Sequence, residues 1–154
     1  MNADELYAVL MTVHDDIVLL PNAAVAEVLS RDALKRTDGG PEWLLGHCEW
    51  NNRIVPVVRL EALNGGHGAG DPKRERVVVI NSLGKHLTGG NVAFVSQGYP
   101  HLVTLNRAAM RPLALRDADR NDLVLGRVRI ASQQAFIPNL ETVEAEVSRA
   151  GIAG

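Results

Sequence analysis

Residues 41–60 read Pro-Glu-Trp-Leu-Leu-Gly-His-Cys-Glu-Trp-Asn-Asn-Arg-Ile-Val-Pro-Val-Val-Arg-Leu. Two largely apolar runs flank the segment 49–52, which predicts a β-hairpin with an aromatic ring and polar side chains at its tip. Pro56 lies inside the second run, where it cannot donate a ladder hydrogen bond. Residues 53–60 are therefore expected to form an edge strand or a bulged strand. An exposed tip beside an irregular strand predicts a surface for contact with another molecule.

The composition fits one globular domain. The chain has 154 residues, of which 46% are hydrophobic but only 4% aromatic, so aliphatic side chains must fill the core. A formal charge of −2 argues against a nucleic-acid partner. The only cluster of positive charge, at 73–76, is interrupted by Glu75, which favours a solvated loop over a phosphate site.

No feature of the chain indicates secretion or membrane insertion. Cys48 is the only cysteine, so no intramolecular disulfide is possible. The first residues lack the basic start and apolar run of a signal peptide. No apolar stretch approaches the ~20 residues that span a bilayer. We expect a cytoplasmic protein that reaches a membrane only through a partner.

Short strands dominate the remaining sequence. About nine are expected, which predicts an all-β barrel or sandwich; they cover residues 7–13, 17–20, 43–50, 53–60, 76–80, 91–96, 101–105, 124–130 and 134–137. Residues 25–29 fit either a strand or a helix. Residues 64–72 and 83–90 are expected to be a loop and a turn, and no internal repeat of fixed period is evident.

Two C-terminal segments carry clear periodicity. Residues 124–130 alternate, with Val128 and Ile130 on one face and Arg127 and Arg129 on the other, as in a half-buried antiparallel strand. After residue 138, apolar residues recur at spacings of three and four from Leu140 onward. This pattern predicts a C-terminal helix that opens at the Pro-Asn pair 138–139.

No catalytic or metal-binding constellation emerges. The five histidines are scattered, and none forms a metal-binding pair. On a strand, His47 and Cys48 point to opposite faces, so Cys48 is expected to be a small buried hydrophobe. The pair Gly84-Lys85 lacks the upstream glycine and the following Ser or Thr of a phosphate-binding loop. The aspartates at 15, 16, 117, 119 and 122 fall in polar turns, where solvated side chains are far commoner than acid–base pairs. We expect a protein that is not an enzyme and has no cofactor.

The hairpin resembles the CheW-like adaptor family of bacterial chemosensory systems. The matching positions are Pro41, Gly46, the run Ile-Val-Pro-Val-Val at 54–58, and Leu60, and residues 25–28 resemble the family's Val-x-Glu-Ile element. The resemblance extends from residue 7 to about 147. It is strongest to a subgroup found with type IV pilus (twitching) systems, through Trp-Leu-Leu-Gly at 43–46, Glu-Trp at 49–50, Gln-Gly-x-Pro at 97–100 and Ala-x-Ile-Pro at 135–138.

This resemblance implies a fold, a function and a set of partners. The fold is two intertwined five-stranded SH3-like β-barrels with a hydrophobic seam and a short C-terminal helix. One domain spans 7–149, with tails at 1–6 and 150–154. The protein is a non-catalytic adaptor that couples the cytoplasmic tip of a methyl-accepting chemoreceptor to the regulatory domain of a CheA-like histidine kinase. By position, the partner-binding residues are Val25, Glu27, Glu49, Trp50, Asn51, Asn52 and Arg53.

The chain departs from the family pattern at three positions. Asn51 and Asn52 stand where the family has a tip arginine and glycine, and Arg59 stands in place of an aspartate. An arginine grips a carboxylate with two hydrogen bonds and an asparagine does not. Strand alternation predicts Arg53 on the same side as Asn51, where it can supply the missing charge.

Other interpretations of these residues remain open from sequence. Trp50 is equally compatible with a core anchor and with an interface hot spot, whereas Trp43 favours the core. Glu27 suits either a solvated strand face or a binding role. The alternative functions are a β-barrel that binds a small apolar ligand between its halves, and a modulator that competes with a standard coupler.

Overall fold

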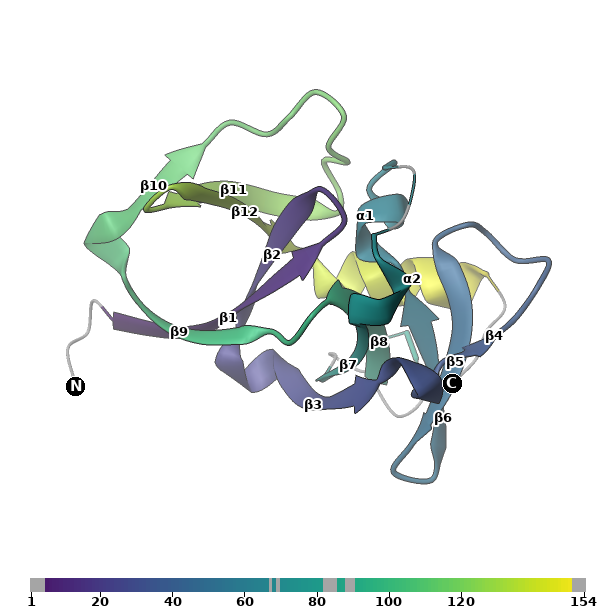
Figure 1. The fold of residues 1–154 in the computed structure, drawn as a ribbon. Coiled ribbons are helices and arrows are strands. Elements are labelled where there is room, and N and C mark those ends of the chain that lie inside the picture. Colours follow the sequence, from purple (N-terminus) through teal and green to yellow (C-terminus); the bar gives the residue numbers. More distant parts are fainter. Residues whose placement is uncertain (1–4, 67, 69, 82–85, 88–90, 151–154) are drawn as a thin grey trace.

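The computed structural model describes residues 5–66, 68, 70–81, 86–87 and 91–150, and these form two β-sheets and a C-terminal helix (Figure 1). The A half contains β1 (Glu5–Val13), β2 (Asp16–Pro21), β9 (His101–Asn106), β10 (Met110–Leu113), β11 (Val124–Ile130) and β12 (Gln133–Pro138). The B half contains β3 (Val25–Ser30), β4 (Lys35–Arg36), β5 (Leu44–Trp50), β6 (Arg53–Val58), β7 (Glu75–Asn81) and β8 (Asn91–Gln97).

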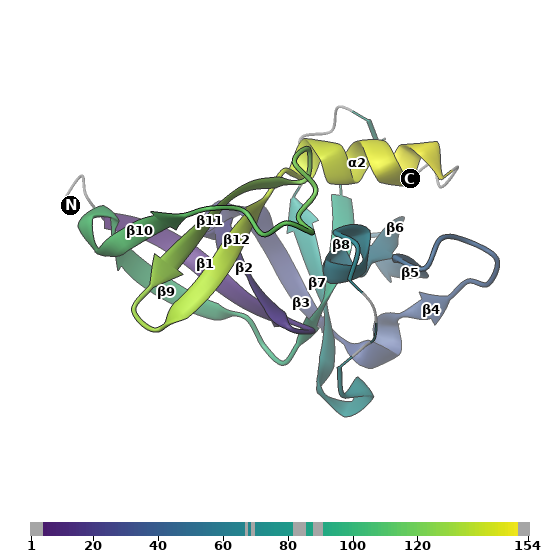
Figure 2. The same cartoon turned by 90° about the horizontal axis from the view of Figure 1, so that it is seen from above.

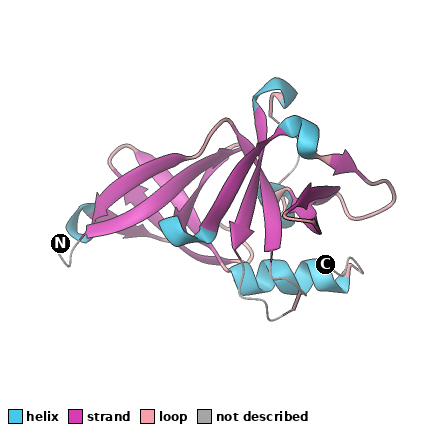
Figure 3. Cartoon of the chain, turned by 90° about the horizontal axis from the view of Figure 1, so that it is seen from below, coloured by secondary structure: helices cyan, strands magenta, loops and turns pink. Residues whose placement is uncertain are grey.

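Short helical elements connect and cover the strands. The α-helices are α1 (Leu60–Leu63) and α2 (Leu140–Arg149), and the 3-10 turns are η1 (Asn22–Ala24), η2 (Arg31–Ala33), η3 (Pro72–Arg74) and η4 (Arg107–Ala109). Figure 3 shows how far strands outweigh helices. The all-β class and the C-terminal helix are confirmed. Each sheet has six strands rather than five, partly because the short strands β4 and β10 carry no sequence signal.

The two halves share one topology. The strand orders are β10-β11-β12-β2-β1-β9 and β4-β5-β6-β8-β7-β3, and in both a hairpin joins its neighbour through a parallel pairing, β12 with β2 or β6 with β8. The hairpin β1–β2 precedes its half along the chain, whereas β7–β8 follows the rest of its half. The chain therefore forms the first hairpin of the A half, then all strands of the B half, and then the remaining strands of the A half. This order gives the intertwined arrangement.

A repeat of 80 residues underlies this likeness. The β5–β6 ladder shifts register between Leu44 and Gly46, and the β11–β12 ladder shifts between Val124 and Gly126. The amide of Arg59 donates to the carbonyl of Trp43, and that of Asn139 donates to the carbonyl of Leu123, both at 2.7 Å. Positions 43, 44, 46 and 59 thus correspond to 123, 124, 126 and 139. The sequence-based conclusion that no repeat exists is wrong.

Three apolar clusters hold the fold together. The largest forms the expected seam: it joins strands of both halves through side chains such as Met11, Phe94 and Phe136, and it includes Val143 and Val147 of α2. Figure 2 shows α2 lying across the molecule above this region. A second cluster fills the B half and a smaller one lines the A half. The Asn139 side chain caps α2 by accepting hydrogen bonds from two backbone amides, as the Pro-Asn signal predicts.

The expectation that the strand with Pro56 is an edge strand or a bulged strand is wrong, because the extra residue of the bulge, between Leu44 and Gly46, lies on the partner strand β5. β6 lies between β5 and β8, yet it pairs with β8 only at Val57 and Val58. Residues 53–56 pair with β5 only. Pro56 is tolerated there because the other side of the strand forms no ladder hydrogen bonds that a missing N–H could interrupt. Residues 25–30, which sequence left open between helix and strand, are the extended strand β3.

A buried ionic cluster in the A half contradicts the expectation of solvated charges. The Arg127 side chain is 2% exposed, and its guanidinium donates twice to Asp119, at 2.7 and 2.8 Å, and twice to Asp16, at 3.1 and 2.9 Å. These hydrogen bonds hold the pKa of Asp119 well below its usual range and raise the pKa of Arg127. Arg127 therefore does not share a solvated face with Arg129, and Asp16 and Asp119 are not solvated turn residues.

Several predictions fall on residues that the structure does not describe. They are the tail residues 1–4 and 151–154, the pair 84–85, and most of the turn expected at 83–90. Among the described residues, neither α-helix is long and apolar enough to cross a membrane.

Candidate functional site

The tip of the β5–β6 hairpin is a tight two-residue turn. Trp50 pairs with Arg53 across the ladder, and Asn51 and Asn52 between them have φ angles of 55° and 61°. Positive φ at both positions is the signature of a type I′ turn, which matches the twist of the flanking strands and favours asparagine. The two asparagines that replace the family's arginine and glycine thus adopt the positive φ angles that this turn requires.

The base of the hairpin tip contacts β3, although β3 and β5 lie far apart in the sheet order. The indole Nε1 of Trp50 donates a hydrogen bond of 3.3 Å to Oε1 of Glu27, 23 residues away in sequence. The Trp50 ring also packs, partly buried, against the apolar cluster of the B half. Trp50 therefore serves as an anchor and as a polar contact, and it joins the two elements that the resemblance singled out.

Arg53 occupies a different place from the one expected. Asn51 belongs to the turn and not to a strand, so strand alternation does not put Arg53 and Asn51 on one side. The Arg53 guanidinium instead donates from Nη1 to Oδ1 of Asn91 on β8, at 3.4 Å. Asn91 in turn donates to the backbone carbonyl of Ile80. Sequence reasoning missed Asn91, which carries no local signal beyond its place at the start of a strand.

Val25 and Glu49 differ in how much of their side chains reaches the surface. Val25 is partly buried and packs against the shared core, so its contribution to a surface is small. Glu49 is exposed on β5 and pairs with Ile54 on β6. Ile54 is 58% exposed and adds one apolar side chain beside the charged tip. We call Glu27, Glu49, Trp50, Asn51, Asn52, Arg53 and Ile54 the tip surface.

Arg59 is not part of the tip surface. It is 6% exposed, and its Nη2 donates to Oε2 of Glu75 at 3.2 Å inside the B half. Glu75 is itself 4% exposed, so the charge run at 73–76 is not simply a solvated loop. The arginine that replaces the family's aspartate is therefore paired in the interior and does not contribute to the tip surface.

The tip surface offers binding groups rather than reactive ones. A carboxylate accepts several hydrogen bonds, so Glu27 retains acceptor capacity beyond its contact with Trp50. Within the described part of the chain, no three His, Cys, Asp or Glu side chains are placed to hold a metal ion. Cys48 is a residue of β5 in this hairpin, and its side chain is fully buried. Burial raises the pKa of its thiol to about 11.

An apolar ligand site between the halves finds no support in this geometry. The packed side chains of the largest apolar cluster occupy the seam where that site was expected. An apolar cavity of about 200 Å³ lies instead within the A half, among residues such as Leu19, Leu105 and Met110.

The chain thus forms two interlocked β halves around a shared core, with a polar and aromatic hairpin tip fixed to β3. The sequence pattern of the CheW-like domain matches residues 8–147, and the chain belongs to that family. The fold is similar to that of the scaffolding protein TtCheW from Thermoanaerobacter tengcongensis, with a TM-score of 0.71, 18% identity, and coverage of 88% of this chain and 89% of that one. A search of the curated proteins finds no match. The chain is thus a non-catalytic, CheW-like scaffold of chemosensory signalling.

Proposed function

We propose that this scaffold couples the cytoplasmic tip of a methyl-accepting chemoreceptor to the regulatory domain of a CheA-like histidine kinase, and that it does so in the cytoplasm through the tip surface. The domain responsible spans residues 7–149, in keeping with the family match over 8–147. The observation that carries the proposal is the hydrogen bond between Trp50 and Glu27, which joins the hairpin tip and β3 into one continuous surface.

The chemistry of the surface supports a protein partner. Trp is enriched among residues that dominate binding energies, and Trp50 is held rigidly by its packing and by Glu27. Glu27 and Glu49 add negative charge, and Ile54 adds an exposed apolar contact. A partner that fits this surface presents an apolar side chain beside a basic or amide donor.

Binding measurements with purified partners test the proposal. The readout is the affinity of the chain for a kinase regulatory domain and for a receptor cytoplasmic hairpin, measured by calorimetry. Trp50→Ala is expected to weaken binding by about 1–3 kcal/mol, because it removes a large contact and releases Glu27. Glu27→Gln tests the carboxylate, and Glu5→Gln is the matched control on an exposed residue of the A half.

The single variant Trp50→Phe and the double variant Glu27→Gln, Trp50→Phe, measured beside Glu27→Gln, check that the two residues act as one unit. The loss of affinity of the double variant is expected to be smaller than the sum of the two single losses, because both changes weaken the same hydrogen bond. Thermal unfolding of every variant separates binding from stability. Failure of the folded wild-type chain to bind either partner, or equal effects of Glu27→Gln and Glu5→Gln, would overturn the proposal.

We further propose that the system controls type IV pili. The support is the set of four short motifs at 43–46, 49–50, 97–100 and 135–138. Removal of the chain from its host should reduce twitching on a surface while leaving flagellar swimming in soft agar unchanged. The opposite result, with swimming lost and twitching intact, would refute the pilus assignment without touching the coupling role.

A further inference from the structure

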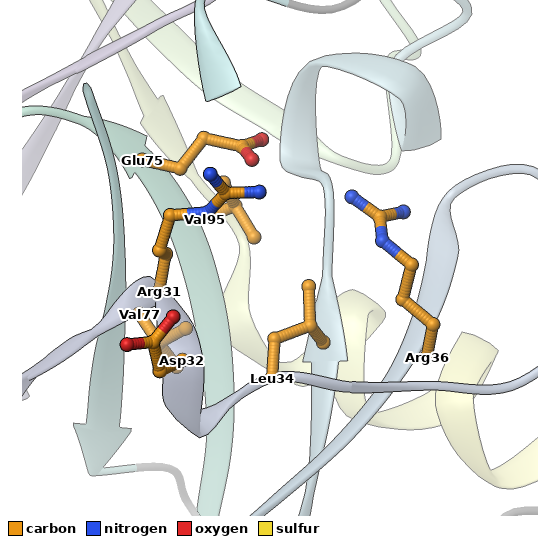
Figure 4. A pocket seen from close by; sticks show the side chains of 7 residues that line it. All are labelled: Arg31, Asp32, Leu34, Arg36, Glu75, Val77 and Val95. Carbon is orange, nitrogen blue, oxygen red and sulfur yellow. The ribbon is translucent and has the colours of Figure 1, made fainter. Parts of the chain in front are cut away.

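A second surface lies on the B half, at the gap between its two edge strands. β3 and β4 end the strand order on opposite sides, and η2 connects them. A cavity of about 260 Å³ opens beside this connection, over an apolar floor of Leu34, Val77 and Val95 (Figure 4). Its volume suits one or two side chains rather than a drug-sized ligand.

The rim of this cavity carries two arginines without partners. Arg31 and Arg36 form no hydrogen bond or ion pair with any described residue, and Figure 4 shows both guanidinium groups beside the hollow. The two acidic rim residues do not cancel this charge. Glu75 is already paired with buried Arg59, which leaves Asp32 as the one acid without an arginine of its own.

The A half shows that this charge is not a by-product of the fold. Among the described residues, those that line the corresponding cavity beside η4 are apolar apart from Tyr7, and Met110 follows η4 as Leu34 follows η2. Arg107 opens η4 as Arg31 opens η2, yet Arg107 does not line that cavity. The same architectural gap is therefore cationic in one half and apolar in the other.

These features together point to an anionic and partly apolar occupant. The apolar floor takes an aliphatic side chain, and two guanidinium groups bind carboxylates in pairs of parallel hydrogen bonds. Asp32 and Glu75 at the rim disfavour a dense polyanion such as a nucleic acid. The unpaired edges of β3 and β4 suit an extended backbone, because edge strands readily pair with another chain.

We propose that the cavity bounded by Arg31, Arg36 and Leu34 binds an acidic segment of a partner protein, in which an aliphatic side chain fills the hollow and a neighbouring Asp or Glu pairs with the two arginines. This site is separate from the tip surface and carries the opposite charge. The proposal goes beyond receptor–kinase coupling and does not depend on it.

A labelled peptide tests this site. The probe is the acetylated, amidated hexapeptide Glu-Leu-Asp-Glu-Leu-Asp with a fluorescein tag, and the comparison probe replaces its acids with Gln and Asn. Anisotropy titration at about 50 mM salt limits the screening of charge pairs. The wild-type chain should bind the acidic peptide, and the double variant Arg31→Ala, Arg36→Ala should weaken binding by about tenfold or more. In ¹H–¹³C spectra, the methyl signals of Leu34, Val77 and Val95 should shift on titration.

Matched controls decide between a built site and general attraction to charge. The double variant Arg107→Ala, Arg111→Ala removes the same charge from exposed positions of the A half and should bind as the wild type does. The proposal is overturned if the wild type does not bind the acidic peptide at millimolar concentration, or if both double variants weaken binding equally. It is also overturned if the neutral peptide binds as well, or if a uridine hexanucleotide binds more tightly. None of these outcomes affects the affinities measured for the kinase domain and the receptor hairpin.

Discussion

The A and B halves have the same backbone plan but are stabilised differently. In the B half, the buried residues of the apolar cluster are at most 3% exposed, whereas those lining the A half reach 8%. The A half instead buries Arg127 with two aspartates, at the position where the B half has partly exposed His47. The B half buries its own ion pair, Arg59 with Glu75, at a different position, so one backbone plan accommodates buried charges at non-equivalent sites.

The comparison also separates the features that shape the backbone from the side chains that differ at the hairpin tips. The features that recur after 80 residues are backbone devices: the bulge at Gly46 and Gly126, and the hydrogen bond that starts each helix. The side chains at the hairpin tips do not recur, since Trp-Asn-Asn-Arg at 50–53 corresponds to Ile-Ala-Ser-Gln at 130–133. The residues that differ between equivalent positions are therefore the ones to examine for binding.

The largest effect is expected from breaking the ionic cluster of the A half. Arg127→Leu leaves Asp119 buried without its cation and Asp16 with only the half-exposed Arg116 at 3.4 Å, which should lower the free energy of unfolding by about 3–5 kcal/mol. His47→Leu at the equivalent position of the B half should change it by less than about 1 kcal/mol. Urea unfolding followed by tryptophan fluorescence measures both.

A rescue variant sharpens this test. Adding Asp16→Asn and Asp119→Asn to Arg127→Leu removes the stranded charges and should recover a large part of the lost stability. If the two asparagine changes make the protein still less stable, the cluster contributes through hydrogen-bond geometry rather than through charge balance.

The same cluster makes the stability of the protein depend on pH. The pKa of Asp119 is lower in the folded chain than in the unfolded chain, because Arg127 stabilises its carboxylate. Its contribution is therefore complete above the usual carboxyl range near about pH 4, and it is lost as pH falls through the folded-state pKa. Urea midpoints from pH 7 to pH 3 should fall for the wild type and fall less steeply for Asp119→Asn.

The bulge glycines provide the next comparison. A Cβ on Gly46, where φ is +151°, would lie 2.0 Å from the carbonyl oxygen of Lys35 on β4, whereas a Cβ on Gly126 would meet no atom within 4 Å. Gly46→Ala should therefore cost about 2–3 kcal/mol, and Gly126→Ala should change stability by less than about 1 kcal/mol. Equal losses would mean that the close approach of β4 to Gly46 relaxes in solution.

The hairpin and its partners show what sequence can and cannot predict. The alternation around Gly46, the turn residues and Pro56 are local signals, so the β5–β6 hairpin was predictable, as was the helix capped by Asn139. The resemblance to a known family supplied Glu27 as a site residue. No local signal indicates that Glu27 meets Trp50, because their strands lie far apart in the sheet order.

Buried charges were the systematic failure. Arg127 alternates with apolar neighbours and looks solvated, but its partner Asp16 lies 111 residues earlier in the chain. Glu75 belongs to a charge run that favours a solvated loop from sequence, although it pairs with Arg59 in the interior. The 80-residue repeat was missed because the two copies share little more than Leu-Gly at 45–46 and 125–126 and the leucines at 60 and 140, while their common hydrogen bonds leave no trace in side-chain identity.

The smallest effects are expected at the two hairpin turns. Ala131 has a φ of 54°, a region that a Cβ disfavours, so Ala131→Gly should stabilise the protein by about 0.5–1 kcal/mol. Asn51 has almost the same φ of 55° but tolerates it, and Asn51→Ala should cost a similar amount. Thermal unfolding measures both, and a loss for Ala131→Gly would show that flexibility of the unfolded chain outweighs the relief of strain. If Asn51→Ala also weakens kinase or receptor binding while Ala131→Gly does not, then the tip turn takes part in recognition and does not merely stabilise the barrel.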